Sequence, residues 1–253
     1  MKIVFLLTLF IPFRGYSQFN NAMTKSIKLG DSTINIVTSI QSSSETLYLN
    51  IHEDEQTSID VAKAFSKKIP INFIFLNHNQ TRRIHFNVNR KRYSVDPNRI
   101  YTEEGRKKTI KPWWRLFLKD AKTQAEHLSN EILNLISPYK TIVSMHNNTD
   151  VNYSIKSYLP KGGEAKNTAQ VYISEKWDAD DFIYTTERRF YDYLKAKNVN
   201  VILQDNEKYV NDGSLSVYCG EKGIPYINIE AQKGHFEEQY KLTEIIHEML
   251  EKI

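Results

Sequence analysis

Short apolar runs rich in β-branched residues alternate along this chain with segments of helical periodicity, a pattern typical of α/β architecture. We expect one α/β domain, with polar stretches at 81–99, read as loop and edge strand, and at 151–167, read as a surface loop. The apolar runs predict strands at residues 26–29, 33–40, 46–51, 71–76, 141–145, 199–203 and 224–229. The periodic segments predict helices at residues 57–67, 114–136, 178–195 and 242–253.

The first 17 residues have the layout of a secretory signal peptide. Lys2 precedes an apolar run over residues 3–13, and Gly15 and Ser17 are spaced as in a signal-peptide cleavage site. Cleavage after Ser17 would leave residues 18–253 as the mature domain. We therefore expect a secreted or periplasmic protein.

The alternative for this segment is an uncleaved membrane anchor. The apolar run is shorter than the roughly 20 residues that a membrane-spanning helix needs, and Pro12 and Arg14 interrupt it. No later segment of the sequence approaches that length. The sequence therefore predicts no stable membrane insertion once the signal peptide is removed.

The positive charge of the chain is concentrated in one segment. The 253 residues carry 34 Lys plus Arg and 30 Asp plus Glu, a formal balance of +4, from which Lys2 and Arg14 would leave with the signal peptide. Residues 82–115 are strongly basic, so the rest of the mature chain is acidic. This distribution excludes a uniformly basic nucleic-acid binder and favours a small anionic partner. The single cysteine, Cys219, excludes a structural zinc site that needs two or more cysteines.

Three predicted strands carry metal-binding or acid–base side chains at their ends. His52 and Glu55 follow one strand, His146 follows a second, and Glu230 closes a third. Functional groups in open α/β sheets gather at strand ends. Two imidazoles and one carboxylate suit Zn²⁺ and leave a fourth position for water, with Glu230 as the general base. The set therefore predicts a catalytic zinc site.

Each of these residues has a simpler interpretation when taken alone. A lone histidine after a strand is more often a satisfied core or loop residue. The acids Glu53, Asp54 and Glu55 could equally form a solvated turn that opens a helix, because carboxylates are favoured at helix N-termini. Only the combination of the three strand ends argues for a site.

Four short motifs resemble, in their order, the signatures of the zinc carboxypeptidase superfamily, which includes the succinylglutamate desuccinylase and aspartoacylase branch. The resemblance covers residues 46–235 and implies a single α/β domain with a mixed, twisted β-sheet flanked by helices on both faces. The motifs are His-Glu-Asp-Glu at 52–55, Asp-Pro-Asn-Arg-Ile-Tyr at 96–101, Ser-Met-His-Asn-Asn at 144–148 and Ile-Glu at 229–230.

The resemblance also implies a role for the residues at the strand ends. His52, Glu55 and His146 match the zinc ligands of the family, and Glu230 matches its general acid/base glutamate. Glu53 and Asp54 depart from the family, whose members usually have smaller or less charged residues there. The two extra acids either tighten cation binding or change the surroundings of the ligands.

Residues of the basic segment also match the substrate-binding residues of the family. Asn98 and Arg99 match the pair that holds a substrate carboxylate, which a planar guanidinium binds with two hydrogen bonds. Arg92 lies where the family commonly places an arginine that polarises the scissile carbonyl, and Arg90 is the alternative for this role.

The sequence thus predicts an exported zinc-dependent hydrolase of an amide bond. A carboxypeptidase-like enzyme is favoured over the aspartoacylase branch, because the chain after Glu230 has room for a final helix and not for a further β-rich domain. The expected substrate is a peptide or an N-acyl amino acid with a free carboxylate. One alternative is an N-acyl amino acid deacylase that shares the site, and another is a non-catalytic binding protein on the same fold.

Overall fold

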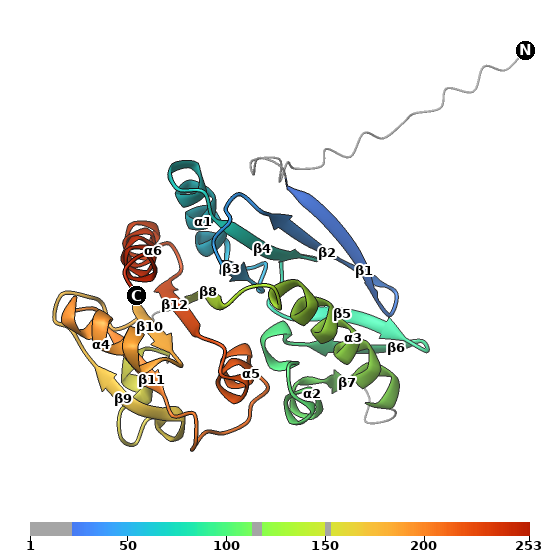
Figure 1. Ribbon diagram of the computed structural model, residues 1–253. Helices are drawn as coiled ribbons and strands as arrows, with labels where there is room; N and C mark the ends of the chain where they lie inside the picture. The colour runs from blue at the N-terminus through green and yellow to red at the C-terminus, as the bar shows by residue number, and fades with distance from the viewer. Residues whose placement is uncertain (1–21, 113–117, 150–152) are drawn as a thin grey trace, which may run out of the picture.

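The computed structural model describes residues 22–112, 118–149 and 153–253, which fold around one large β-sheet (Figure 1). The predicted signal peptide and the start of the helix predicted at 114–136 lie outside the described residues. The strands are β1 (Met23–Leu29), β2 (Ser32–Ser39), β3 (Thr46–Asn50), β4 (Asn72–Asn77), β5 (Ile84–Val88), β6 (Lys91–Val95), β7 (Lys111–Pro112), β8 (Thr141–Asn148), β9 (Thr168–Tyr172), β10 (Phe182–Thr185), β11 (Val201–Gln204) and β12 (Tyr226–Gln232). The α-helices are α1 (Gln56–Lys68), α2 (Glu103–Thr109), α3 (Leu118–Ile136), α4 (Arg188–Ala196), α5 (Leu215–Lys222) and α6 (Phe236–Leu250). Short 3-10 helices are η1 (Pro97–Arg99), η2 (Ile155–Tyr158) and η3 (Ala165–Asn167).

The large sheet contains nine strands in the order β1-β2-β4-β3-β8-β12-β10-β11-β9. The central strands β4, β3, β8 and β12 run parallel to one another, whereas β1, β2, β9 and β10 form antiparallel pairs, so the sheet is mixed. A second, antiparallel sheet contains β5, β6 and β7. The basic stretch predicted as loop and edge strand forms most of this small sheet.

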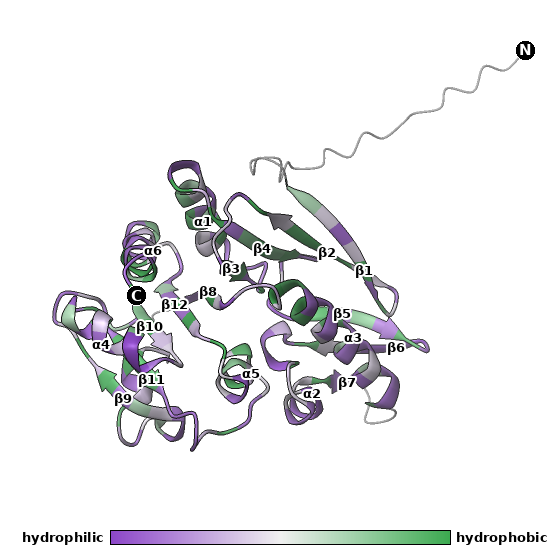
Figure 2. Cartoon of the chain, in the orientation of Figure 1, coloured by the Kyte–Doolittle hydropathy of each residue, from purple (hydrophilic) through white to green (hydrophobic). Residues whose placement is uncertain are grey.

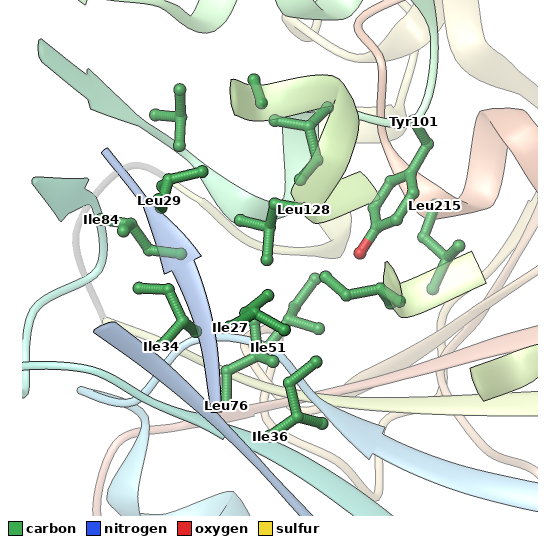
Figure 3. Close-up of a cluster of buried hydrophobic side chains, with 14 of the residues drawn as sticks. Ile27, Leu29, Ile34, Ile36, Ile51, Leu76, Ile84, Tyr101, Leu128 and Leu215 are labelled. Carbon is green, nitrogen blue, oxygen red and sulfur yellow. The ribbon is translucent and has the colours of Figure 1, made fainter. Parts of the chain in front are cut away.

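Two hydrophobic cores cover the two faces of the large sheet. One core joins the sheet to α3 and α5 and includes Leu128 and Leu215 (Figure 3). The other core joins the opposite face to α1, α4 and α6 and includes Phe65, Phe190 and Leu242. Figure 2 shows the matching pattern, with apolar residues along the central strands. The predicted α/β domain, a mixed sheet flanked by helices on both faces, is confirmed.

The helix α3 shows how the sequence pattern produces this packing. Its buried residues recur every three or four positions, which places them on one face of the helix, toward the sheet. The helix ends at Ile136, two residues before Pro138, whose ring cannot continue an α-helix. The buried side chains are Ala121, Ala125, Leu128, Ser129, Ile132 and Ile136.

Two predicted elements differ from the structure. The helix predicted at 178–195 is wrong in its first half, where Phe182–Thr185 forms β10 and only Arg188–Ala196 is helical. All four residues of β10 are buried. Ile183 packs in the core with α1, α4 and α6, whereas Phe182 and Tyr184 pack in a cluster with Ile155, so the short apolar run has no two-residue alternation. The stretch predicted as a surface loop at 151–167 contains η2, in which Ile155 is buried. Among the described residues, no helix has the length and apolarity of a membrane span.

Two glycines allow α2 to approach the loop before α5. A Cβ on Gly105 would lie 2.2 Å from the Cα of Gly213 and 2.8 Å from the carbonyl oxygen of Arg99. Gly213 has a φ of 81°, and its carbonyl oxygen accepts a hydrogen bond of 3.0 Å from the backbone N–H of Tyr101. This contact fixes the backbone around Arg99, one of the predicted substrate-binding residues.

Replacing Gly105 with alanine tests this close approach. In an unconstrained helix, alanine would raise the free energy of unfolding by about 1 kcal/mol. Here the backbone clash should instead lower the free energy of unfolding, measured by chemical denaturation, by about 1–3 kcal/mol. Gly163→Ala is the control, because a Cβ there meets nothing within 4 Å. A more stable Gly105→Ala protein would contradict the contact.

Candidate metal centre and adjoining cavity

Three neighbouring strands bring the predicted metal ligands and Glu230 to one edge of the sheet. The strands β3, β8 and β12 are adjacent and parallel, so their carboxyl ends meet at this edge. His52 follows β3, and Glu55 immediately precedes α1. His146 lies in β8 directly opposite Glu230 in β12. The topology therefore gathers residues that are far apart in the sequence.

The three predicted ligands converge on one point. The Nδ1 atoms of His52 and His146 are 3.2 Å apart, and each lies 2.9 Å from one carboxylate oxygen of Glu55. All three side chains are buried, and their ligand atoms lie within 4.8 Å of one another. Imidazole nitrogens and a carboxylate at this spacing are a donor set for a divalent cation such as Zn²⁺.

The outer nitrogen of each imidazole ring has its own partner. Nε2 of His52 lies 2.8 Å from Oδ1 of Asp96, and Nε2 of His146 lies 2.9 Å from Oγ of Ser144. Such partners fix the tautomer and the ring orientation of metal-binding histidines and leave the other nitrogen for the metal. The residues therefore fit a metal ion, which His52, Glu55 and His146 would hold.

The buried charges of this site are strongly coupled. Burial alone would lower the pKa of His52, but the Glu55 and Asp96 carboxylates outweigh it and raise this pKa to about 9. Burial alone would raise the pKa values of Glu55 and Asp96, but His52 and the other neighbouring cations hold both well below the ordinary values. A proton and a metal ion therefore compete for Nδ1 of His52, and metal affinity should weaken at low pH.

A cavity of about 520 Å³ opens beside the metal ligands. Glu230 lines it, and burial raises the pKa of this carboxyl group above its ordinary value. The amide Nδ2 of Asn228 donates a hydrogen bond of 2.9 Å to Oε1 of Glu230. The carboxylate of Glu230 is therefore buried, oriented by Asn228 and placed beside the metal ligands. Its lining residues include Asp54, Glu55, Arg82, Asn98, Arg99, His146, Asn148, Tyr153, Tyr158, Glu164, Asn167, Tyr184, Tyr209, Asp212, Tyr226, Asn228, Glu230 and Lys233.

The predicted carboxylate-binding pair also lines this cavity. Asn98 is held by two hydrogen bonds, one from its backbone N–H to Oδ1 of Asp96 and one from the N–H of Leu215 to its own Oδ1. Arg99 donates from Nη1 to the carbonyl oxygen of Asn98 at 2.8 Å, and its Nε lies 3.2 Å from Oδ2 of Asp212. A guanidinium has five N–H donors, so Arg99 retains donors for a ligand.

The structure does not bring Arg92 into the cavity. Arg92 is exposed on β6, where a rise of about 3.3 Å per residue separates it from Asp96 by about 13 Å along the chain. Arg90, the alternative, lies in the β5–β6 turn with a φ of 60°. The guanidinium beside the metal ligands is that of Arg82, whose Nη1 donates to Oε1 of Glu55 at 2.9 Å and whose Nε lies 3.6 Å from Oδ2 of Asp96.

Sequence reasoning also missed one wall of the cavity. Tyr153, Tyr158 and Glu164 line it, although they belong to the stretch predicted as a surface loop. No local periodicity marks these residues, and only their aromatic and acidic character in a polar stretch hinted at a binding role. Tyr218 packs against the core, with its ring 6.4 Å from that of Tyr101.

Comparison with known proteins finds similarity among solved structures. The succinylglutamate desuccinylase from Chromobacterium violaceum is 10% identical, with 90% of this chain and 70% of that chain covered and a TM-score of 0.46. The murein-tripeptide amidase from Escherichia coli O157 is 11% identical, with 91% and 92% covered and a TM-score of 0.45. The ectoine utilization protein from Ruegeria pomeroyi is 11% identical, with 90% and 66% covered and a TM-score of 0.48.

The first of these neighbours carries the name of the branch that the four sequence motifs resemble. No protein-family model matches the chain, and no curated protein matches it. Because these TM-scores are below 0.5, a function can be argued only from the side chains of the site itself.

The outer partner of His52 provides a test of the metal centre. Asp96→Asn keeps an oxygen at Oδ1 and removes the charge that orients His52, so zinc affinity, measured by competition with a chromophoric chelator, should fall about 10–100-fold. Asp192→Asn, on the exposed surface of α4, is the matched control and should leave the affinity unchanged. Equal affinity in Asp96→Asn and wild type would contradict this role of Asp96.

Proposed function

We propose that the protein is a zinc-dependent hydrolase of an amide bond, of the carboxypeptidase-like type. One observation carries the proposal: the buried His52, Glu55 and His146 converge beside a cavity into which the same sheet edge delivers Glu230. A structural zinc site would be closed by a fourth protein ligand, whereas this three-residue set borders a cavity. The arrangement therefore suits catalysis.

The residues around the ligands suit the movement of a proton. Zinc bound here would lower the pKa of water and polarise a carbonyl group. Glu230 would accept the proton of the attacking water and then donate it to the leaving nitrogen, and its raised pKa favours this second step. The N–H groups of Arg82 would donate to the carbonyl oxygen as negative charge develops on it.

The proposed substrate class rests on a second arginine of the cavity, Arg99. Arg99 lines the same cavity and is oriented by Asn98 and Asp212, so it can hold a carboxylate at a fixed place relative to Glu230. A substrate with a free carboxylate near the scissile amide would therefore be positioned for attack. We propose a peptide that is cleaved at its carboxyl-terminal residue.

We also propose that the enzyme is exported. The support is the sequence alone, with Lys2, the apolar run at 3–13 and the small residues Gly15 and Ser17. N-terminal sequencing of the protein recovered from the producing cells checks the proposal. The expected first residue is Gln18, and a mature chain that retains Met1 would overturn it.

Glu230→Gln separates metal binding from turnover. The variant keeps the size of the side chain and loses its basicity, so it should bind zinc like the wild type while kcat falls about 10²–10⁴-fold. Glu175→Gln, at an exposed position outside the cavity, is the control and should retain full activity. A wild type that never binds zinc, or a fully active Glu230→Gln, would disprove the proposal.

A substrate panel distinguishes the proposed peptidase from its two alternatives. Short peptides with a free carboxylate should be hydrolysed faster than N-acyl amino acids of matched side chain. Selective turnover of N-acyl amino acids would identify a deacylase. Zinc binding without hydrolysis of either class would identify a non-catalytic binding protein.

Arg82→Ala and Arg92→Ala form a matched pair of variants. Loss of Arg82 removes a donor to the developing oxyanion, so kcat should fall about 10²–10³-fold once the variant is fully loaded with zinc. Arg92→Ala removes the same charge from an exposed strand and should leave kcat close to wild type. The opposite ranking would restore the assignment suggested by the sequence resemblance.

A further inference from the structure

Four buried polar side chains hydrogen-bond to the backbone at or near the metal ligands, and we call them the polar network: Asn50, Ser58, Asn147 and Gln239. They come from β3, α1, β8 and α6, in that order. Each of the four residues is at most 9% exposed. The network therefore joins the C-terminal helix α6 to the elements that carry the ligands.

Gln239 in α6 holds the backbone of His146. Its side chain is fully buried, Nε2 donates a hydrogen bond of 2.9 Å to the carbonyl oxygen of His146, and Oε1 accepts one of 2.9 Å from Nδ2 of Asn147. A carbonyl oxygen only accepts, so it fixes which end of the Gln239 amide faces His146. A buried amide is costly unless both of its ends are bonded, so this side chain has one favourable position. Two consecutive residues of β8 are thus tied to α6.

Asn147 extends this connection to Glu55. Its Oδ1 accepts a hydrogen bond of 2.9 Å from the backbone N–H of Ser58, and its Nδ2 also donates to the carbonyl oxygen of Ala231 at 3.3 Å. Ser58 in turn donates from Oγ to the carbonyl oxygen of Glu55 at 2.7 Å. A chain of hydrogen bonds therefore connects the backbone of His146 with that of Glu55.

Asn50 completes the network beside the third ligand. It is the last residue of β3, two positions before His52. Its Nδ2 donates to Oγ of Ser58 at 2.6 Å and to the carbonyl oxygen of Met145 at 3.2 Å. The network thus fixes the three backbone segments from which the ligands project. Ligands that are ordered before the cation arrives lose less entropy on binding it, and the difference appears as affinity.

We propose that Gln239 and Asn147 are positioning residues that preorganise the metal ligands through their backbone. The outer partners described above orient the imidazole rings, whereas the polar network places the backbone that carries the rings and the Glu55 carboxylate. This inference rests on the proposed function, because it concerns the metal site that the function requires.

Zinc affinity in the absence of substrate tests the network. Gln239→Met removes both hydrogen bonds of the amide and keeps the length of the side chain. The affinity of the folded variant, measured by competition with a chromophoric chelator, should fall about 10–100-fold, the effect of losing a residue that supports metal ligands. Asn147→Ala interrupts the same connection and should weaken zinc binding to a similar degree. Asn147 also lines the cavity, so the absence of substrate excludes an effect on substrate binding.

Asn200→Ala is the matched control. Asn200 is also a buried asparagine with three hydrogen bonds, from the N–H of Ser174 and to the carbonyl oxygens of Asp178 and Asp181. The same truncation there should lower the free energy of unfolding and leave zinc affinity unchanged. The comparison therefore separates positioning of the ligands from a general loss of stability.

If Gln239→Met does not fold, Asn147→Ala decides the outcome, because it removes a smaller part of the interior. Wild-type zinc affinity in the folded network variants, or an equal loss of affinity in Asn200→Ala, would overturn the role of the network. Zinc binding by the wild type without hydrolysis of any amide would count against the proposed function alone. A wild type that binds no zinc would overturn both.

Discussion

The parallel pairing of β8 with β12 is the contact on which the rest of this site depends. Neighbouring strands lie about 4.8 Å apart, so backbone hydrogen bonds alone set His146 beside Glu230. The pairing of β3 with β8 then delivers His52 to the same edge. Because apolar cores hold both faces of the sheet, these positions cannot shift without disrupting packed side chains.

The negative charge at this edge of the sheet favours a cationic ligand. Glu55 and Asp96 are carboxylates in a poorly hydrated place, and burying a charge is costly unless it is paired. Without a metal, a proton on His52 and the guanidinium of Arg82 compensate them. A divalent cation bonded to Glu55 would offset more of this negative charge, so the same carboxylates favour metal binding.

Some of this architecture can be read from the sequence, because local patterns encode it. The periodicity of α3 and the polar residues at three strand ends follow from spacing along the chain. The identity of the arginine beside the metal ligands does not follow from spacing, because the β5–β6 hairpin carries Arg92 away from them while the segment before β5 brings Arg82 to Glu55. Strand β10 could not be predicted from alternation, because a strand buried on both faces has none. The cavity wall at Tyr153 and Tyr158 depends on packing against Phe182 and Tyr184, which are distant in the sequence.

The residues that line the cavity come from two kinds of backbone, the strands of the sheet and the segments that connect them. The metal ligands and Glu230 lie on or directly beside strands of the central sheet. The lining residues Glu164 and Asp212 lie instead on segments that connect the secondary-structure elements. Connections tolerate substitution and insertion far better than packed strands do. Evolution could therefore change the lining residues on these connections while the metal ligands and Glu230 keep their places. Related enzymes would then differ in substrate preference while they catalyse the same reaction.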